Sequence, residues 1–407
     1  MRKAQLIAGL AAVLATSFTL AACGGQSSSD DSGSTGSSSS GASTGASTSG
    51  ATEAKETGPI KMGVTIEKTG PVPVLGTAAI GMQKAADYIN ANGGVDGRQI
   101  ELDIQDNAGD PSKAVSQLRQ FIDNGYDVVL GGAFGINCAA ESAIAAKADV
   151  IVFCISTDNL PEDDSHMFGI GTGYDVTIDH YAEVLSQQAK KVAVFADKVK
   201  SGDDSARQAP ADLEKRGVEV LLERTDPNAS TYKPGIQKAI ADGAEAIWFT
   251  QCTPTVISAV GDAQALGFKG KIMLENCLAS LDVAKAVKGF AAKDPEQIEI
   301  LAPSMFVPDE SANPEQKAAN ELFLQEMGQP DTVKGAGWDG VFLAKKAIED
   351  NGGTDPASLL QTLENNFQFE GVWQGGTYTA EDHRGNDGSG YLVPVYFTPD
   401  GDFTPQK

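Results

Sequence analysis

The feature that most constrains the fold is an alternation between short apolar runs and longer segments with helical periodicity. The run Ile60–Ile66 is mostly apolar, and after a turn the residues Ala79, Met82, Ala86 and Ile89 recur at helical spacing. Short continuous apolar runs are typical of parallel strands that helices cover on both faces. The alternation therefore predicts layered α/β structure with right-handed crossovers.

The alternation continues along the chain and changes character toward its end. Further strands are predicted at Ile100–Ile104, Val128–Leu130, Val150–Cys154, Val192–Ala196, Val218–Leu222, Ala246–Thr250 and Ile272–Leu274. After about Pro303 helices predominate, at Pro314–Met327, Gly340–Asn351 and Pro356–Asn365, and a β-rich tail follows around Tyr378 and Tyr391–Phe397. One helix start is well marked, because Asp110 is a favourable N-cap and Pro111 lacks only an N–H that the first turn leaves unbonded.

The loops that follow the predicted strands are the expected place for a binding site. In open parallel sheets, ligands bind outside the carboxyl ends of the strands. Any site should therefore be assembled from the segments near Thr69–Gly76, Ala133–Cys138, Ser156–Asn159, Lys198–Gly202, Gln251–Pro254 and Glu275–Cys277.

The N-terminus reads as an export signal. Two basic residues precede an apolar stretch that ends at Leu20-Ala21-Ala22-Cys23, and this junction resembles a bacterial lipobox. Residues 1–22 are thus a predicted signal peptide, with Cys23 acylated and anchored at the outer face of the cytoplasmic membrane. A membrane span, or an ordinary signal with an incidental cysteine, is the alternative. Residues 23–57 are rich in Ser and Gly and predict a disordered tether.

Charge and metal-ligand spacing argue against several functional classes. The 31 basic residues face 55 acidic ones, a net charge of −24, which argues against nucleic-acid binding. The sequence has no C-x-x-C, and His166, His180 and His383 are scattered, so we expect no metal site and no cofactor. No second long apolar run follows the N-terminal one, and the body from residue 58 onward has a length that suits two domains.

Several motifs together carry a family resemblance. They are T-G-P at 69–71, G-G-V-x-G-R at 93–98, D-P-x-K-A at 110–114 and D-H-R-G at 382–385. With these motifs the chain resembles the branched-chain amino-acid-type solute-binding proteins, which belong to the type I periplasmic-binding family of ABC importers. The resemblance covers nearly the whole body.

The resemblance implies a type I periplasmic-binding fold, with two doubly wound α/β lobes joined by a three-stranded hinge. With crossings near Asp175, Pro303 and Gly385, lobe I would comprise 58–175 and 304–385, and lobe II 176–303 and 386–407. The implied function is non-enzymatic: a monomer captures a small polar solute between its lobes and delivers it to an ABC permease. A ligand-sensing lipoprotein with the same fold, and an extracytoplasmic α/β hydrolase, are the alternatives.

The resemblance also implies which residues face the ligand. A carboxylate-binding serine of relatives falls at Gly135, which leaves the backbone N–H groups of Gly135, Ile136 and Asn137 to receive an anion or carbonyl. Glu275 stands where relatives place the acid that pairs with an ammonium group. The remaining candidates lie in the same loops and crossings; they are Leu75, Phe134, Ser156, Thr157, Asp158, Tyr174, Asp175, Ser201 and Cys252.

Some of these candidates have a structural alternative. Asp158 would equally cap a turn, Asp175 would equally be the N-cap of a helix Val176–Gln188, and Phe134 would equally plug the lobe. Three acids (Glu275, Asp158 and Asp175) without an obvious pocket arginine favour an amine, an amide or a polyol as the ligand.

The four cysteines of the body repeat one layout. Cys138 and Cys154 follow neighbouring strands in lobe I, and Cys252 and Cys277 do so in lobe II. Neighbouring strand ends satisfy the Cα separation of at most ~7 Å that a bridge requires. An even number of cysteines in an exported chain favours disulfides, so we expect Cys138–Cys154 and Cys252–Cys277, with zinc as the alternative.

Overall fold

The structure is a computed structural model in which residues Lys55–Lys407 form one compact unit. It describes residues 57–406 apart from 157–159, 161–165, 172, 199, 227–228, 308–311, 374 and 386–391, and apart from the side chains of residues 200 and 201. The predicted signal peptide, acylated Cys23 and nearly all of the predicted tether lie outside the described residues.

The N-terminal part of the body forms a five-stranded parallel sheet in the order β2-β1-β3-β4-β5. Its strands are β1 (Ile60–Ile66), β2 (Ile100–Asp106), β3 (Val128–Gly131), β4 (Val152–Cys154) and β5 (Met167–Gly169). β1 lies between β2 and β3, and its apolar side chains are buried on both faces of the sheet. The carboxyl ends of all five strands lie at one edge because every pairing is parallel.

A second sheet has seven strands in the order β14-β13-β10-β9-β8-β6-β7. They are β6 (Lys191–Asp197), β7 (Glu219–Thr225), β8 (Ala246–Phe249), β9 (Lys271–Leu274), β10 (Ile298–Pro303), β13 (Leu392–Phe397) and β14 (Phe403–Pro405). The strands from β10 to β7 are parallel, whereas β13 and β14 are antiparallel additions from the C-terminus. A separate hairpin pairs β11 (Phe367–Glu370) with β12 (Gly375–Tyr378).

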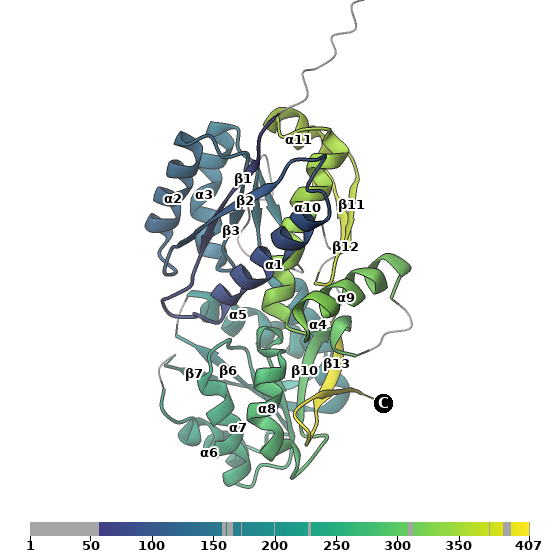
Figure 1. Ribbon diagram of the computed structural model, residues 1–407. Helices are drawn as coiled ribbons and strands as arrows, with labels where there is room; N and C mark the ends of the chain where they lie inside the picture. Colours follow the sequence, from purple (N-terminus) through teal and green to yellow (C-terminus); the bar gives the residue numbers. More distant parts are fainter. Residues whose placement is uncertain are drawn as a thin grey trace, which may run out of the picture. The chain divides into compact units, whose positions relative to one another are not determined.

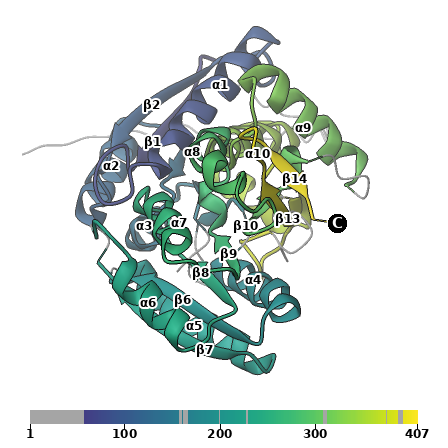
Figure 2. The same cartoon turned by 90° about the horizontal axis from the view of Figure 1, so that it is seen from below.

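Helices cover both faces of each sheet. The longer helices are α1 (Ala78–Ala91), α2 (Pro111–Asp123), α3 (Gly135–Ala148), α4 (Tyr174–Gln188), α5 (Lys200–Lys215), α6 (Lys233–Ala241), α7 (Thr255–Ala265), α8 (Leu281–Ala291), α9 (Pro314–Met327), α10 (Thr332–Asn351) and α11 (Pro356–Glu364). α2 and α3 pack together on one side of the first sheet, with α1 and α10 on the other (Figure 1). α5 packs against β6 and β7 in the second sheet (Figure 2).

The pair α1 and α10 brings distant parts of the sequence together through two glycines. A Cβ atom on Gly81 would lie 1.9 Å from the carbonyl oxygen of Lys334, and one on Gly337 would lie 2.0 Å from that of Ala78. The two backbones approach this closely only because these positions lack a side chain. Beyond the glycines, Trp338 packs on Tyr88 with ring centroids 6.2 Å apart.

Most strands of both sheets and the start of α2 agree with the sequence predictions, whereas the start of α10 differs. The expected strands before residue 275 are present, with bounds that differ by a few residues, and Asp110 caps α2 by accepting a hydrogen bond of 2.8 Å from the Ser112 N–H. β5 and β10 are additional strands. α10 begins at Thr332 instead of Gly340, because Gly335 and Gly337 serve close packing and do not end the helix. Its N-cap is Asp331, which accepts from the Lys334 N–H at 2.9 Å.

Within the described residues, no helix combines the length and the apolar character that crossing a bilayer would require.

Candidate ligand-binding cavity

A cavity of about 440 Å³ lies at the carboxyl ends of strands from both sheets. From the first sheet it is lined by the loop after β1 and by the β3–α3 junction; from the second it is lined by residues that follow β6, β8 and β9. Tyr174 and Asp175 of α4, and Arg384 near the C-terminus, complete its wall. Sequence reasoning predicted a site at these strand ends, and the cavity lies there.

Most of the predicted site residues that the structure describes meet in this cavity. The wall includes Leu75, Phe134, Gly135, Ile136, Tyr174, Asp175, Cys252 and Glu275. Ser156 lies in an adjoining smaller cavity. Thr157 and Asp158 lie outside the described residues, as does the side chain of Ser201.

The expectation for the Asn137 N–H is wrong. This N–H donates to the carbonyl oxygen of Phe134 at 2.9 Å, and the Asn137 side chain is fully buried away from the cavity. The Asn137 N–H is therefore bonded within the first turn of α3. Of the three predicted donors, the N–H groups of Gly135 and Ile136 remain candidates for binding a ligand oxygen.

The charges that line the cavity differ from the expectation in one respect. Sequence reasoning found no pocket arginine, but Arg207 and Arg384 both line the wall. Arg207 pairs with Asp204 at 2.8 Å, and Arg384 lies 3.6 Å from Asp175. With Asp197 and Glu275 also in the wall, four acidic residues stand against two arginines. The cavity is therefore acidic overall.

Glu275 follows β9 and is only 2% exposed. Its carboxylate accepts a hydrogen bond of 3.4 Å from the Asn276 N–H, where a short 3₁₀ turn begins. Beneath it, the Tyr181 hydroxyl donates to the Leu274 carbonyl at 3.0 Å. Burial, followed by the nearby Glu275 carboxylate, raises the pKa of Tyr181 well above its ordinary value, so this hydroxyl stays protonated. The acid thus lies buried at the cavity wall, close to a protonated tyrosine hydroxyl.

Helices α4 and α5 meet at the cavity through polar contacts. The Tyr174 and Ser205 hydroxyls are hydrogen-bonded, and the Gln208 side chain donates to the Asp175 carbonyl at 2.8 Å. Asp175 is not the N-cap that one interpretation proposed, because the N-cap of α4 is Gly173 and Asp175 lies in the first turn. Its carboxylate faces Arg384.

Two disulfides join neighbouring strand-end segments beside the cavity. Cys138–Cys154 connects α3 with the end of β4 across a Cα distance of 6.3 Å, and Cys252–Cys277 connects the segments after β8 and β9 across 5.8 Å. This is the pairing expected from the sequence. Cys252 lines the main cavity and Cys277 the smaller one.

The smaller cavity, of about 120 Å³, continues from the main one. The two share Leu75, Ala133, Tyr174 and Asn276 in their walls. Beyond these shared residues, its wall includes the apolar side chains of Ile155, Val333, Ala336 and Trp373, together with the hydroxyl-bearing Ser156, Thr177 and Thr332. The combined space suits a molecule with a polar head and a compact apolar part.

Several lining residues were missed by sequence reasoning for different reasons. Gln251 lies in a loop that was predicted to contribute, and Asp197 ends the strand before another such loop, so a signal for them existed. Val333, Ala336 and Arg384 come from segments far along the chain, whose approach depends on the packing of α10 and the C-terminal return. Arg384 belongs to the D-H-R-G motif, but no local pattern places any of the three at the site.

Comparisons with known proteins agree with this architecture. A family model described as periplasmic binding protein matches residues 59–397. An "Amino acid binding protein" of Pseudomonas aeruginosa is 26% identical over 294 residues, which cover 70% of this chain and 76% of that protein.

Solved structures share the fold at low sequence identity. A leucine-binding protein LivK from Thermotoga maritima superposes with a TM-score of 0.71 at 18% identity, covering 86% of this chain and 98% of the other. A fatty acid ABC transporter substrate-binding protein from Thermomonospora curvata gives 0.67 at 20% identity, covering 86% and 91%.

The fold and its cavity at the strand ends define a periplasmic binding protein, a class that works outside the cytoplasm. The chain belongs to the periplasmic-binding-protein family, and its resemblance to the branched-chain amino-acid type within the type I fold is confirmed.

Proposed function

We propose that the chain is the lipid-anchored solute-binding component of an ABC importer and performs no catalysis. Acylation of Cys23 would hold it at the outer face of the membrane, within reach of the permease subunits. We assign lobe I to 58–175 and 304–385 and lobe II to 176–303 and 386–407, with the ligand bridging them on hinge closure. The observation that carries the proposal is the acidic cavity, which strand-end residues of both sheets line.

The proposed ligand is an amino acid or a related amine or amide. Glu275 would accept the ammonium group, because a buried carboxylate forms charge-assisted hydrogen bonds with such a donor. The N–H groups of Gly135 and Ile136 would receive the carboxylate or carbonyl oxygen. The apolar part of the ligand would enter the smaller cavity beside Ala336 and Trp373.

A thermal-shift screen of the full chain against amino acids, amines, amides, polyols and aromatic acids tests the ligand class. We expect the melting temperature to rise with an amino acid, an amine or an amide, since a ligand that binds only the folded state stabilises it. If no compound of these three classes raises it, the proposed ligand class is wrong.

Glu275→Gln should weaken binding of an amine-containing hit about 10- to 150-fold, because a hydrogen bond to a charged group contributes about 1.5–3 kcal/mol. Isothermal titration calorimetry measures the change. Asp282→Asn is the matched control, because it also removes one carboxylate but lies exposed on α8 outside the cavity. Equal affinity of Glu275→Gln and the wild type for the amine would contradict the assignment.

Ala336→Leu should weaken L-leucine binding about 5- to 150-fold, since overpacking a filled site costs about 1–3 kcal/mol. Glycine, which has no side chain to enter the smaller cavity, should bind Ala336→Leu as it binds the wild type. Ala336→Gly is the control that leaves the space open, and leucine should retain its affinity for it. A parallel loss for leucine and glycine would place the apolar part of the ligand elsewhere.

A further inference from the structure

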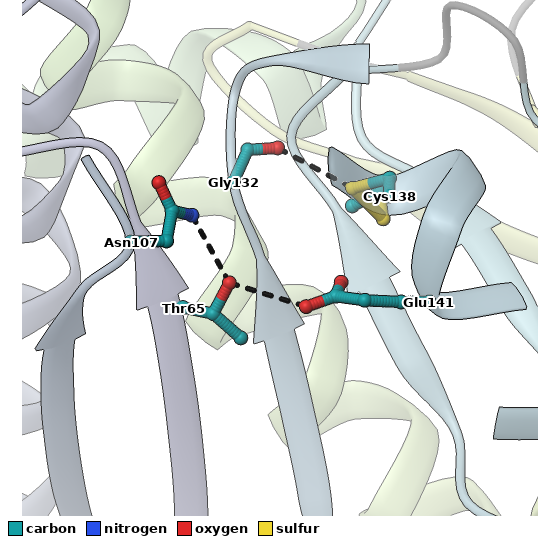
Figure 3. Close-up of a disulfide and its surroundings, with 6 residues drawn as sticks. Thr65, Asn107, Gly132, Cys138 and Glu141 are labelled. Atoms are coloured by element: carbon teal, nitrogen blue, oxygen red, sulfur yellow. Dashed lines mark hydrogen bonds between the residues drawn. A yellow bond between two sulfur atoms is a disulfide. The ribbon is translucent and has the colours of Figure 1, made fainter. Parts of the chain in front are cut away.

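Two buried acids lie beneath the cavity at the carboxyl edge of the first sheet. Glu67, just after β1, is 2% exposed, and Glu141 of α3 is 0% exposed. A hydrogen-bond chain leads to Glu141: the Asn107 side chain donates to the Thr65 hydroxyl at 3.1 Å, and this hydroxyl donates to Glu141 Oε1 at 3.2 Å (Figure 3). Glu141 Oε2 is buried with no hydrogen-bond partner among the described residues.

Neither acid has a cationic partner among the described residues. The charge that acts on Glu67 is that of Asp106 at the end of β2, another carboxylate, which raises the pKa of Glu67. The pKa of Asp106 is itself lowered to about 2, chiefly by the Thr69 hydroxyl. The positive charge of Lys113 on α2 also lowers the pKa of Asp106. Asn137 of α3 carries no charge. Glu141 lies within 4.8 Å of the two sulfur atoms of Cys138–Cys154, which does not titrate.

Burial without a counter-charge favours the protonated form of a carboxyl group. Burial is the largest effect on both groups; it raises the pKa of Glu67 to about 7 and that of Glu141 to about 8, from an ordinary value of 4.5. The hydrogen bond from Thr65 lowers the pKa of Glu141 and the proximity of Glu67 raises it. Both groups therefore exchange protons near neutral pH.

The acids lie against the floor of the ligand cavity. Glu67 Oε2 lies 2.4 Å from where a Cβ atom of Gly132 would be, so Gly132 lets the carboxyl group approach the β3–α3 loop. Ala133 follows Gly132 in the chain, and its backbone N–H lies near the Glu67 carboxyl group. Ala133 also lines both cavities. Glu141 lies on the buried side of α3, whose first residues Gly135 and Ile136 line the main cavity.

We propose that Glu67 and Glu141 form a proton-binding site that sets the charge beneath the cavity floor and couples ligand binding to pH. The inference rests on the proposed function, in which a ligand carboxylate lies at the start of α3. An ionised acid beneath that position repels the carboxylate, and its protonation removes the repulsion. A carboxylate-bearing ligand therefore binds more tightly at acidic pH and takes up protons as it binds.

The test compares two probes that differ only in the carboxylate: L-leucine and isoamylamine, its decarboxylated counterpart. Calorimetry of the full chain from about pH 6 to about pH 9 spans both raised pKa values. We expect the leucine affinity to fall with rising pH, by at most about tenfold per pH unit for each coupled proton. The isoamylamine affinity should not fall, because no carboxylate meets the acids.

The double variant Glu67→Gln/Glu141→Gln should abolish this difference between the two probes. Glu101→Gln is the control, because Glu101 is an exposed acid on β2 and its loss should leave the pH profile unchanged. A leucine profile that is the same in the double variant and in the wild type would overturn the proposal.

A readout without ligand separates this proposal from the proposed function. Infrared spectroscopy should detect a protonated carboxyl group in the wild type near pH 7 that is missing from the double variant. Absence of that band in the wild type would overturn the proton-binding site. If the band is present but neither leucine nor isoamylamine binds, the proposed ligand class fails and the coupling to pH falls with it, while the proton-binding site stands.

Discussion

Replacing Gly337 with valine is expected to lower the free energy of unfolding by about 3 kcal/mol or more, the upper end for overpacking a filled interior. A Cβ atom at this position would lie 2.0 Å from the carbonyl oxygen of Ala78, which is backbone and cannot rotate aside. The two helices must therefore separate, and the contact between Trp338 and Tyr88 loosens with them. Chemical denaturation monitored by circular dichroism measures the change.

Gly289→Ala is the control for this experiment. Gly289 lies inside α8, and a Cβ atom there would meet nothing within 4 Å. Alanine at an open helical site should be neutral or raise stability by up to about 1 kcal/mol. If Gly337→Val unfolds at the same denaturant concentration as Gly289→Ala, the close crossing of α1 and α10 is not a feature of the protein in solution.

Removing the second disulfide, as Cys252→Ser/Cys277→Ser, should lower stability by about 3.5 kcal/mol. This figure follows from the loop-closure entropy that the bond, with its sequence separation of 25, removes from the unfolded chain. Ligand affinity should fall as well, because the bond ties together two segments that line the cavities and one of them carries Glu275. Thermal denaturation and ligand titration measure the two effects separately.

Cys138→Ser/Cys154→Ser is the comparison for the second experiment. Its shorter separation of 16 residues gives a loss of about 3 kcal/mol by the same argument, but neither of its cysteines lines a cavity. We therefore expect similar destabilisation by the two double variants and a larger loss of affinity for the Cys252/Cys277 pair. Equal affinity losses would indicate that the second disulfide has no local role at the cavity wall.

The sequence predicts much of this fold because its local patterns and its packing agree. Val192–Ala196 and Ala246–Thr250 are continuous apolar runs, and the corresponding strands are buried on both faces. α10 was predicted too short, since a glycine that ends a helix and one that permits a close crossing look alike in sequence. Gly335 and Gly337 belong to the second kind, and only the position of their packing partners reveals it.

The residues of the candidate site also differ in whether local sequence or long-range packing places them. Glu275 and Cys252 follow predicted strands, so their place at the edge of a sheet follows from local sequence. Arg384 and Ala336 reach the cavities only through long-range packing, which single-sequence patterns do not encode. The Asn137 N–H illustrates a third limit: the N–H groups of Gly135, Ile136 and Asn137 were predicted to receive a ligand oxygen, but which of them stays unbonded depends on how the first turn of α3 closes.

The short span of both disulfides has a consequence for how the protein matures. Each bond joins cysteines within one contiguous stretch of chain, 16 and 25 residues apart, and neither involves the C-terminal strands that complete the second sheet. As the chain emerges into an oxidising compartment, both bonds can close before its last hundred residues arrive. The strand-end segments beside the cavity would then be cross-linked before the rest of the chain folds. α10 and β13, which are synthesised later, would pack against segments that the disulfides already hold together.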